Sequence, residues 1–260
     1  MTKKYQSITN KLAPVVAVAV IILIWFLCNN FEIVPAYMLP SPLDVARAFI
    51  DNFSVMLKQA AVTLQEAIYG LGIGIVLAFI VAALMDRFRF LRKAIYPILV
   101  ITQTIPTIAI APLLVLWMGF GMAPKITLVV ITTFFPISIG LLNGFENADR
   151  DEINMMRSMG ANGLQIFRHI KLPSAAGAFF SGLKISASYA IVGAVISEWL
   201  GGFEGLGVYM TRVKKAYAFD KMFAVIVFIS AVSLLLIAIV SVLQHIAMPW
   251  EQKKVKGKQI

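Results

Sequence analysis

The sequence is poor in charge, cysteine and histidine, and each scarcity removes a class of protein. Only 14% of its 260 residues are charged, whereas 60% are hydrophobic, a balance that soluble globular domains do not have. Cys28 is the one cysteine, which excludes an internal disulfide and a thiol cluster. His169 and His245 lie far apart in the sequence and have no partner at ligand spacing, which argues against a metal site.

Motifs for nucleotide binding and catalysis are also missing. The sequence contains no G-x-x-x-x-G-K-[ST], the loop that cradles nucleotide phosphates. Its apolar segments hold no Ser/His/Asp, Cys/His or paired-carboxylate arrangement that suggests catalysis. We therefore expect neither an enzyme nor a cofactor on this chain.

The net charge of +10 raises the question of nucleic-acid binding. The basic residues flank apolar runs, however, and do not form one face interleaved with aromatic residues. Lysine and arginine in this arrangement are typical of the cytoplasmic loops of membrane proteins. We expect a lipid bilayer and no nucleic acid as the partner of these charges.

Long apolar runs indicate an all-α membrane protein. A helix needs about 20 residues to cross the hydrocarbon core, and six runs are long enough. The first run follows a basic segment, as in a signal peptide, but no small-x-small cleavage site follows it, so we interpret it as a retained helix. The predicted spans are 12–29, 64–85, 94–118, 125–144, 174–198 and 222–247.

The distribution of Lys and Arg predicts the orientation. If the N-terminus is cytoplasmic, the segments on that side hold most of the Lys and Arg residues. The positive-inside rule then places both termini in the cytoplasm. Between the first two spans, Pro40-Ser41-Pro42 precedes an amphipathic stretch, which predicts an external surface helix near 42–58.

A polar segment interrupts the apolar runs between the fourth and fifth spans. Its charged residues cannot lie in hydrocarbon. The pattern predicts a first short helix at 149–160 that ends at Gly160, a second at 163–169, and a membrane helix that begins at Pro173. Such a segment is suited to dock into another protein.

The same segment carries a family signature. Gly160, Ile170, Leu172 and Pro173 are spaced as in E-A-A-x3-G-x9-I-x-L-P, which resembles the cytoplasmic motif of binding-protein-dependent ABC importer permeases. Asn154-Met155-Met156 replaces Glu-Ala-Ala, and Glu152 is a candidate for the missing charge. Three further runs resemble the nitrate/sulfonate/taurine branch: Leu39-Pro40-Ser41-Pro42, Ile105-Pro106-Thr107 to Gly121, and Ser197-Glu198-Trp199-Leu200 to Gly207.

The resemblance implies a type I ABC importer permease fold with six transmembrane helices in the cell membrane of a prokaryote. It divides the chain into a cytoplasmic N-terminus (1–11), a first helix with an external segment (12–62), a permease core of five helices (63–247) containing a cytoplasmic coupling segment (146–173), and a cytoplasmic basic tail (248–260). In the family, the coupling segment seats in a groove of an ATPase subunit. The implied coupling residues are Asp151, Glu152, Asn154, Met155, Met156, Arg157, Met159, Gly160, Ile170, Leu172 and Pro173.

The resemblance also implies the partners. They are an ABC ATPase dimer that binds ATP and Mg²⁺, a second permease copy, expected to make a homodimer, and an extracytoplasmic solute-binding protein. Lys214 and Lys215 are a hypothetical contact for the binding protein. Nitrate, organosulfonates and pyrimidine vitamin precursors are alternative solutes, and the lack of a basic cluster in the spans favours a neutral ring compound. A stand-alone secondary carrier or channel is the alternative function, but no central Asp or Glu for ion coupling is visible in the spans.

Polar residues within the spans are candidates for the solute path. Proline breaks the third span near Gln103, and polar groups at a broken membrane helix often line a path. Thr and Ser can instead bond to their own helix carbonyls. A face of small residues in the fifth span, from Gly182 to Ser197, is suited to meet a second copy or the passage, with packing inside the chain as the alternative. The candidate path residues are Gln103, Thr104, Thr107, Thr133, Ser186, Ser197 and Glu198.

Overall fold

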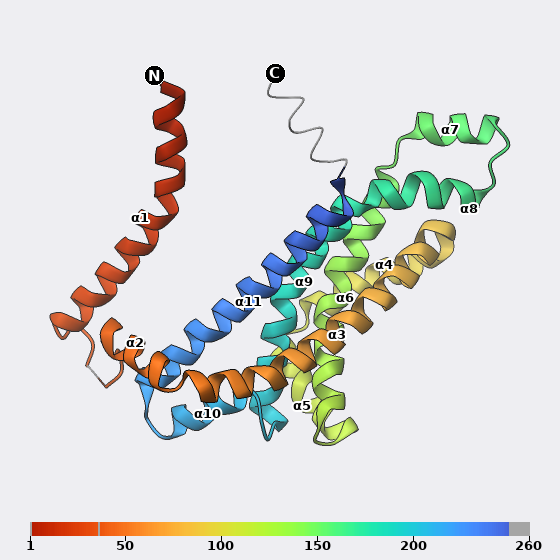
Figure 1. Ribbon diagram of the computed structural model, residues 1–260. Helices are drawn as coiled ribbons and strands as arrows, with labels where there is room; N and C mark the ends of the chain where they lie inside the picture. The colour runs from red at the N-terminus through yellow and green to blue at the C-terminus, as the bar shows by residue number, and fades with distance from the viewer. Residues whose placement is uncertain (1, 36, 250–260) are drawn as a thin grey trace. The chain divides into compact units, whose positions relative to one another are not determined.

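The computed structural model describes residues 2–35 and 37–249, with side chains from Ala13 onward, and the secondary structure of these residues is entirely helical. Part of the predicted basic tail, 250–260, lies outside the described residues. Figure 1 shows the helices in chain order. Their bounds are α1 Thr2–Asn30, α2 Pro42–Asp51, α3 Phe53–Arg87, α4 Arg89–Thr104, α5 Thr107–Met118, α6 Met122–Glu146, α7 Arg150–Ser158, α8 Gly163–Ile166, a π-helical turn Phe167–Lys171, α9 Leu172–Gly201, α10 Leu206–Lys215 and α11 Phe219–Ala247.

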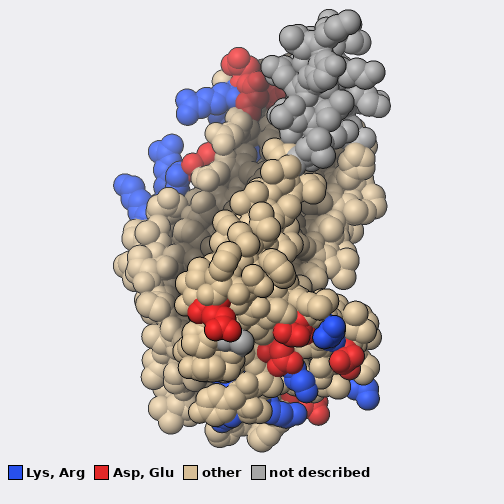
Figure 2. Space-filling view, turned by 90° about the vertical axis from the view of Figure 1, so that its left-hand side faces the viewer, with Lys and Arg blue, Asp and Glu red and all other residues tan. Residues whose placement is uncertain are grey.

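The predicted six-span architecture is confirmed. Among the described residues, five helices are long and apolar enough to cross a membrane, and the bent pair α4 and α5 passes the same test together, which gives up to six spans. The pair bends by 101° at Ile105 and Pro106. Pro106 forces Ile105 into an extended conformation (φ −81°, ψ 122°), since a residue before proline is disfavoured in the helical region. Figure 2 shows one face of the molecule, on which Lys, Arg, Asp and Glu gather in a few groups and most side chains are uncharged, as expected of a surface that contacts lipid.

The predicted surface helix at 42–58 is too long at its C-terminal end. Ser41 caps α2 by accepting a hydrogen bond from the Asp44 amide, and Pro42 takes the first helical position. The helix ends at Asp51 because Asn52 leaves the helical conformation. The side-chain amide of Asn52 donates a hydrogen bond to Ala48 O at 2.8 Å. Residues 53–58 are therefore the first turns of α3.

Pro173 lies in the first turn of α9, as the sequence predicted, but α9 is not separated from the helix before it. Helical structure runs without interruption from Gly163 to Gly201. The π-helical turn before α9 gives the Leu172 amide the carbonyl of Phe167 as acceptor. This wider turn lets a residue without an N–H group follow at once, so the proline is accommodated near the start of α9.

Contacts divide the chain into two compact units. One comprises the residues up to Lys58 together with Tyr209–Phe228. In it, the Trp25 indole donates to Pro40 O at 3.0 Å and its ring stacks on Phe223 at 5.7 Å. These contacts hold the chain that leads into α2 against α1.

The second unit comprises Gln59–Val208 and the helix from Ile229 onward. Its centre is the pair α6 and α9, which Figure 1 shows side by side. Glycines permit this approach: a Cβ on Gly182 would lie 2.5 Å from Pro136 O, and one on Gly144 would lie 2.5 Å from Cα of Ala175. On the other side of α6, Gly70 of α3 lies against Val129. Small residues thus bring α3, α6 and α9 into close contact, as in other membrane helix bundles.

We predict that Gly182→Ala destabilises the protein by roughly 1–3 kcal/mol, because the new methyl group would overlap the backbone of α6. Gly72→Ala is the matched control, since a Cβ there meets nothing within 4 Å. Thermal unfolding of the full-length chain in detergent measures both. Equal midpoints for the two variants would mean that the close helix contact is not needed.

Candidate functional site

A hairpin of two short helices projects from the second unit at the start of α9 (Figure 1). Asp149 caps α7 by accepting a hydrogen bond from the Asp151 amide at 2.8 Å. Gly160 ends it with φ +84°, and the Ala161 amide bonds Met156 O at 2.9 Å, which is a glycine C-cap of the Schellman type. The sequence had predicted this left-handed glycine.

The second helix of the hairpin has its own cap. Asn162 accepts a hydrogen bond from the Gln165 amide, and the Gln165 side chain accepts one from the Asn162 amide. This reciprocal arrangement satisfies two amide groups that would otherwise have no helical partner. The hairpin is therefore defined by its own hydrogen bonds at the turn.

Large apolar side chains are exposed on this hairpin. Met155, Met159 and Leu164 are 61%, 78% and 75% exposed. They lie among charged residues of a segment that cannot enter the bilayer, so lipid does not explain their exposure. Exposed apolar groups with a polar rim are typical of a protein contact surface.

The predicted coupling residues fall into two groups. Ile170 is buried, 6% exposed, and fastens the base of the hairpin; Met156 and Leu172 are partly buried. The remaining residues are exposed and available to a partner, namely Asp151, Glu152, Asn154, Met155, Arg157, Met159, Gly160 and Pro173. Their role in coupling stays a prediction.

An ion pair that the sequence analysis missed ties the hairpin to the membrane helices. Lys171 Nζ lies 2.6 and 2.8 Å from the two carboxylate oxygens of Asp86, near the end of α3. Phe167 packs beside it against Phe79 and Phe145, with ring centroids 6.5 and 5.1 Å apart. The base of the hairpin is thus bound to both α3 and α6.

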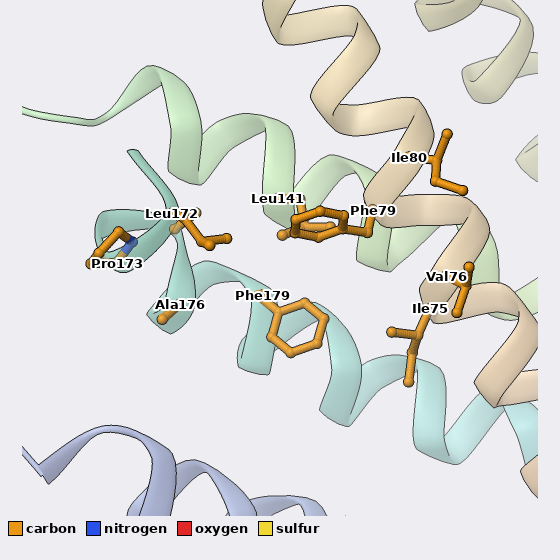
Figure 3. A pocket seen from close by; sticks show the side chains of 10 residues that line it. Ile75, Val76, Phe79, Ile80, Leu141, Leu172, Pro173, Ala176 and Phe179 are labelled. Atoms are coloured by element: carbon orange, nitrogen blue, oxygen red, sulfur yellow. The ribbon is translucent and has the colours of Figure 1, made fainter. Parts of the chain in front are cut away.

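Two hollows of different character lie near this base. One, of about 650 Å³, has a mixed lining: Asp86, Arg157 and Lys171 contribute charge, and Leu164 and Phe167 are apolar. The other, of about 520 Å³, is lined by Ile75, Val76, Phe79, Leu141, Phe179 and other apolar residues of α3, α6 and α9 (Figure 3). The apolar groove has no group to bind a polar solute, whereas the mixed hollow is lined in part by Arg157 and Leu164 of the hairpin.

A third hollow lies at the break between α4 and α5. It has a volume of about 170 Å³, and Gln103, Thr107, Thr132 and Tyr189 line it. Two of these residues, Gln103 and Thr107, are predicted path residues. Tyr189 of α9 was not predicted, since a single tyrosine in a long apolar run gives no distinguishing signal.

The other predicted path residues lie elsewhere. Thr104 is exposed but bonds its own helix at Ile101 O. Thr133 bonds Val129 O, Ser186 bonds Thr133 O, and Ser197 bonds Ala194 O, and all three are buried. Glu198 is also buried and belongs to a separate polar cluster described below.

The small-residue face of α9 is covered within the chain. The sequence suited it to a second copy or the passage, with packing inside the chain as the alternative, and Gly182, Ser186 and Gly193 of this face lie against α6. Ser186 and Ser197 satisfy their hydroxyl groups in this packing. A role of Ser186 and Ser197 in the solute path stays a prediction, and neither residue lines the hollow at the broken helix.

Fold and site together define a class: a multi-pass α-helical membrane protein with one polar helical hairpin outside its spans and a broken helix within them. Comparison with known proteins identifies the family. The chain belongs to the binding-protein-dependent transport system inner membrane components, whose sequence pattern matches residues 70–250. It is the permease subunit of an ABC importer, and such systems comprise ATPase and binding-protein partners.

Known relatives agree along nearly the whole chain. A probable ABC transporter permease protein of Haemophilus influenzae is 36% identical over 234 residues, covering 90% of this chain and 96% of that protein. The formylaminopyrimidine transport permease protein ThiX of Halalkalibacterium halodurans is 33% identical over 255 residues, covering 98% and 100%. The taurine permease TauC of Escherichia coli is 24% identical over 241 residues, covering 89% and 87%. The predicted nitrate/sulfonate/taurine branch is confirmed.

A solved structure supports the fold alone. The methionine ABC transporter MetNI, in inward-facing conformations, aligns with a TM-score of 0.58 at 18% identity, over 73% of this chain and 93% of that one. The predicted type I permease fold is confirmed.

We predict that Gly160→Ala loosens the end of α7. An alanine at φ +84° costs about 1–2 kcal/mol, and roughly 1.4 kcal/mol is a tenfold change in local opening. Hydrogen exchange at the Gly160 and Ala161 amides of the full-length chain should speed up about tenfold. Gly163→Ala, where a Cβ meets nothing within 4 Å, is the control and should leave these amides unchanged. Unaltered exchange in Gly160→Ala would contradict the cap.

Proposed function

We propose that the hairpin of α7 and α8 couples solute import to ATP hydrolysis on a separate ATPase subunit. The observation that carries this proposal is the exposed apolar patch of Met155, Met159 and Leu164 on a polar hairpin. Methionine side chains adapt to an apolar groove, and the family motif lies at the same residues. ATP and Mg²⁺ belong to the partner, and this chain binds no cofactor.

The connection from hairpin to membrane is stiff. The helical path from Gly163 to Gly201 has no loop in it. The Lys171–Asp86 ion pair joins that path to α3 where the hairpin begins. A push on α8, which carries Leu164 of the patch, therefore moves α9 and α3 together instead of bending a flexible linker.

The proposed arrangement places the hairpin and both termini in the cytoplasm. The excess of Lys and Arg on that side supports it. A second copy of this chain completes the translocation path, and an extracytoplasmic binding protein delivers the solute to the opposite face. Lys214 and Lys215 are exposed at the end of α10 and offer positive charge to that protein.

The hollow at the broken helix is the proposed solute contact. Gln103 supplies an amide and Tyr189 an aromatic ring, and none of its lining residues is charged. This chemistry suits a neutral ring compound that forms hydrogen bonds along its edge. The formylaminopyrimidine permease relative supports a pyrimidine-type solute.

The coupling role of the patch can be tested by placing serine at a residue of the patch and at an exposed residue outside it. Met155→Ser should lower ATPase activity of the assembled importer several-fold, because the partner loses an apolar contact. Phe90→Ser, which removes a side chain that is 80% exposed outside the hairpin, should have little effect. Equal activities of the two variants would contradict a coupling role for Met155.

Alanine variants of two adjacent residues, Gln103 and Thr104, test the proposed solute contact. Gln103→Ala should reduce uptake several-fold, because it removes the amide from the hollow while leaving assembly intact. Thr104→Ala is the control, since Thr104 bonds its own helix and does not line the hollow. The measurement is uptake of labelled solute in vesicles with a fixed amount of assembled importer. Normal uptake by Gln103→Ala would remove the hollow from the path.

A further inference from the structure

A buried polar cluster lies at the end of α9 opposite to the hairpin. Glu66 of α3, Lys125 of α6 and Glu198 of α9 are 0%, 5% and 1% exposed. Lys125 Nζ lies 2.6 Å from Glu66 Oε1. The three residues come from three different helices, so the cluster joins their ends.

The cluster also holds the connection between α9 and α10. The Gly207 amide donates to Glu198 Oε2 at 2.6 Å, and the Thr63 hydroxyl donates to Glu198 Oε1 at 2.7 Å. The Leu206 amide donates in turn to Thr63 Oγ at 2.9 Å. Room for this turn requires glycine, because a Cβ on Gly205 would lie 2.1 Å from Glu198 Oε1.

Hydrogen-bond donors are distributed unevenly between the two acids. Both oxygens of Glu198 accept a hydrogen bond, as suits an ionised carboxylate. Glu66 Oε2 is buried and has no donor among the described residues. Glu198 is the second buried acid of the cluster, and two ionised carboxylates have no proton to share between them.

Charge leads to the same conclusion. Among the described residues, the cluster contains one buried base, Lys125, and two buried acids, Glu66 and Glu198. With all three groups ionised, the cluster would carry one uncompensated negative charge away from water, which is costly. One proton on an acid makes it neutral and supplies the missing donor.

We propose that Glu66 is a proton-binding site that holds a neutral carboxylic acid between Lys125 and Glu198. Its Oε1 accepts from the Lys125 ammonium group, and its Oε2–H donates to the Glu198 carboxylate. The cluster then contains one positive and one negative charge, and every buried oxygen has a partner. The proton thereby helps to fasten the turn after α9 to α3 and α6.

Glutamine is the test, because its amide reproduces a neutral carboxylic acid with one acceptor and a donor. In the full-length chain in detergent, Glu66→Gln should unfold within about 2 °C of wild type. Glu198→Gln should unfold at a lower temperature than Glu66→Gln, because its NH₂ group either faces the Gly207 donor or makes the Thr63 hydroxyl turn away to the more distant Gln59 O. Glu66→Ala, which removes both functions, should also be less stable than Glu66→Gln.

Infrared spectroscopy detects the proton directly. The wild type minus Glu66→Gln difference spectrum at neutral pH, in a maltoside detergent without ester groups, should contain the carbonyl band of a protonated carboxylic acid. Absence of that band would overturn the proposal. So would a Glu66→Gln variant as unstable as Glu66→Ala, or a Glu198→Gln variant at least as stable as Glu66→Gln, which would place the proton on Glu198.

Discussion

Hydrocarbon cannot solvate a peptide group or a charge, and this constraint governs the whole structure. It requires that each span be a helix whose backbone groups bond within the helix, and the apolar runs of this chain satisfy it. It also excludes the charged segment between α6 and α9 from the bilayer. The hairpin of α7 and α8 must therefore stand outside the membrane, where a partner protein can reach it.

Close packing turns this hairpin into part of a stiff body. Gly144 and Gly182 let α6 and α9 approach until backbone meets backbone. At one end of this pair, Lys171 and Asp86 join the hairpin to α3. At the other end, Glu66, Lys125 and Glu198 join α3, α6 and α9 again. Force applied at the hairpin is thus transmitted along helices that are fixed to one another at both ends.

Features with a local cause were predictable from the sequence. Hydropathy located the six spans, Pro106 marked the break in the third, and the spacing at Gly160 located the end of α7. The bounds of two helices were predicted wrongly, because the end of a helix depends on the conformation of the residues that follow it. Asn52 ends α2 yet does not prevent α3 from starting one residue later, and a π-helical turn joins α8 to α9 without a break.

Contacts between residues far apart in the chain could not be predicted from the sequence. A serine on a small-residue face looks the same whether it lines a path or packs on a helix, so the placement of Ser186 against α6 could not be foreseen. Asp86 and Lys171 are separated by 85 positions, and no spacing rule pairs them. Tyr189 could not be assigned to the candidate site from the sequence either, because only the bend between α4 and α5 brings Gln103 beside it.

The central claim is that the hairpin of α7 and α8 faces the cytoplasm and is bound there by the ATPase subunit. Cysteine labelling tests it in a chain with Cys28→Ser and Met155→Cys, using a maleimide that does not cross membranes. The account predicts labelling of residue 155 in inside-out vesicles but not in intact cells, and protection when the ATPase subunit is bound. Labelling in intact cells, or labelling that the ATPase does not slow, would contradict it.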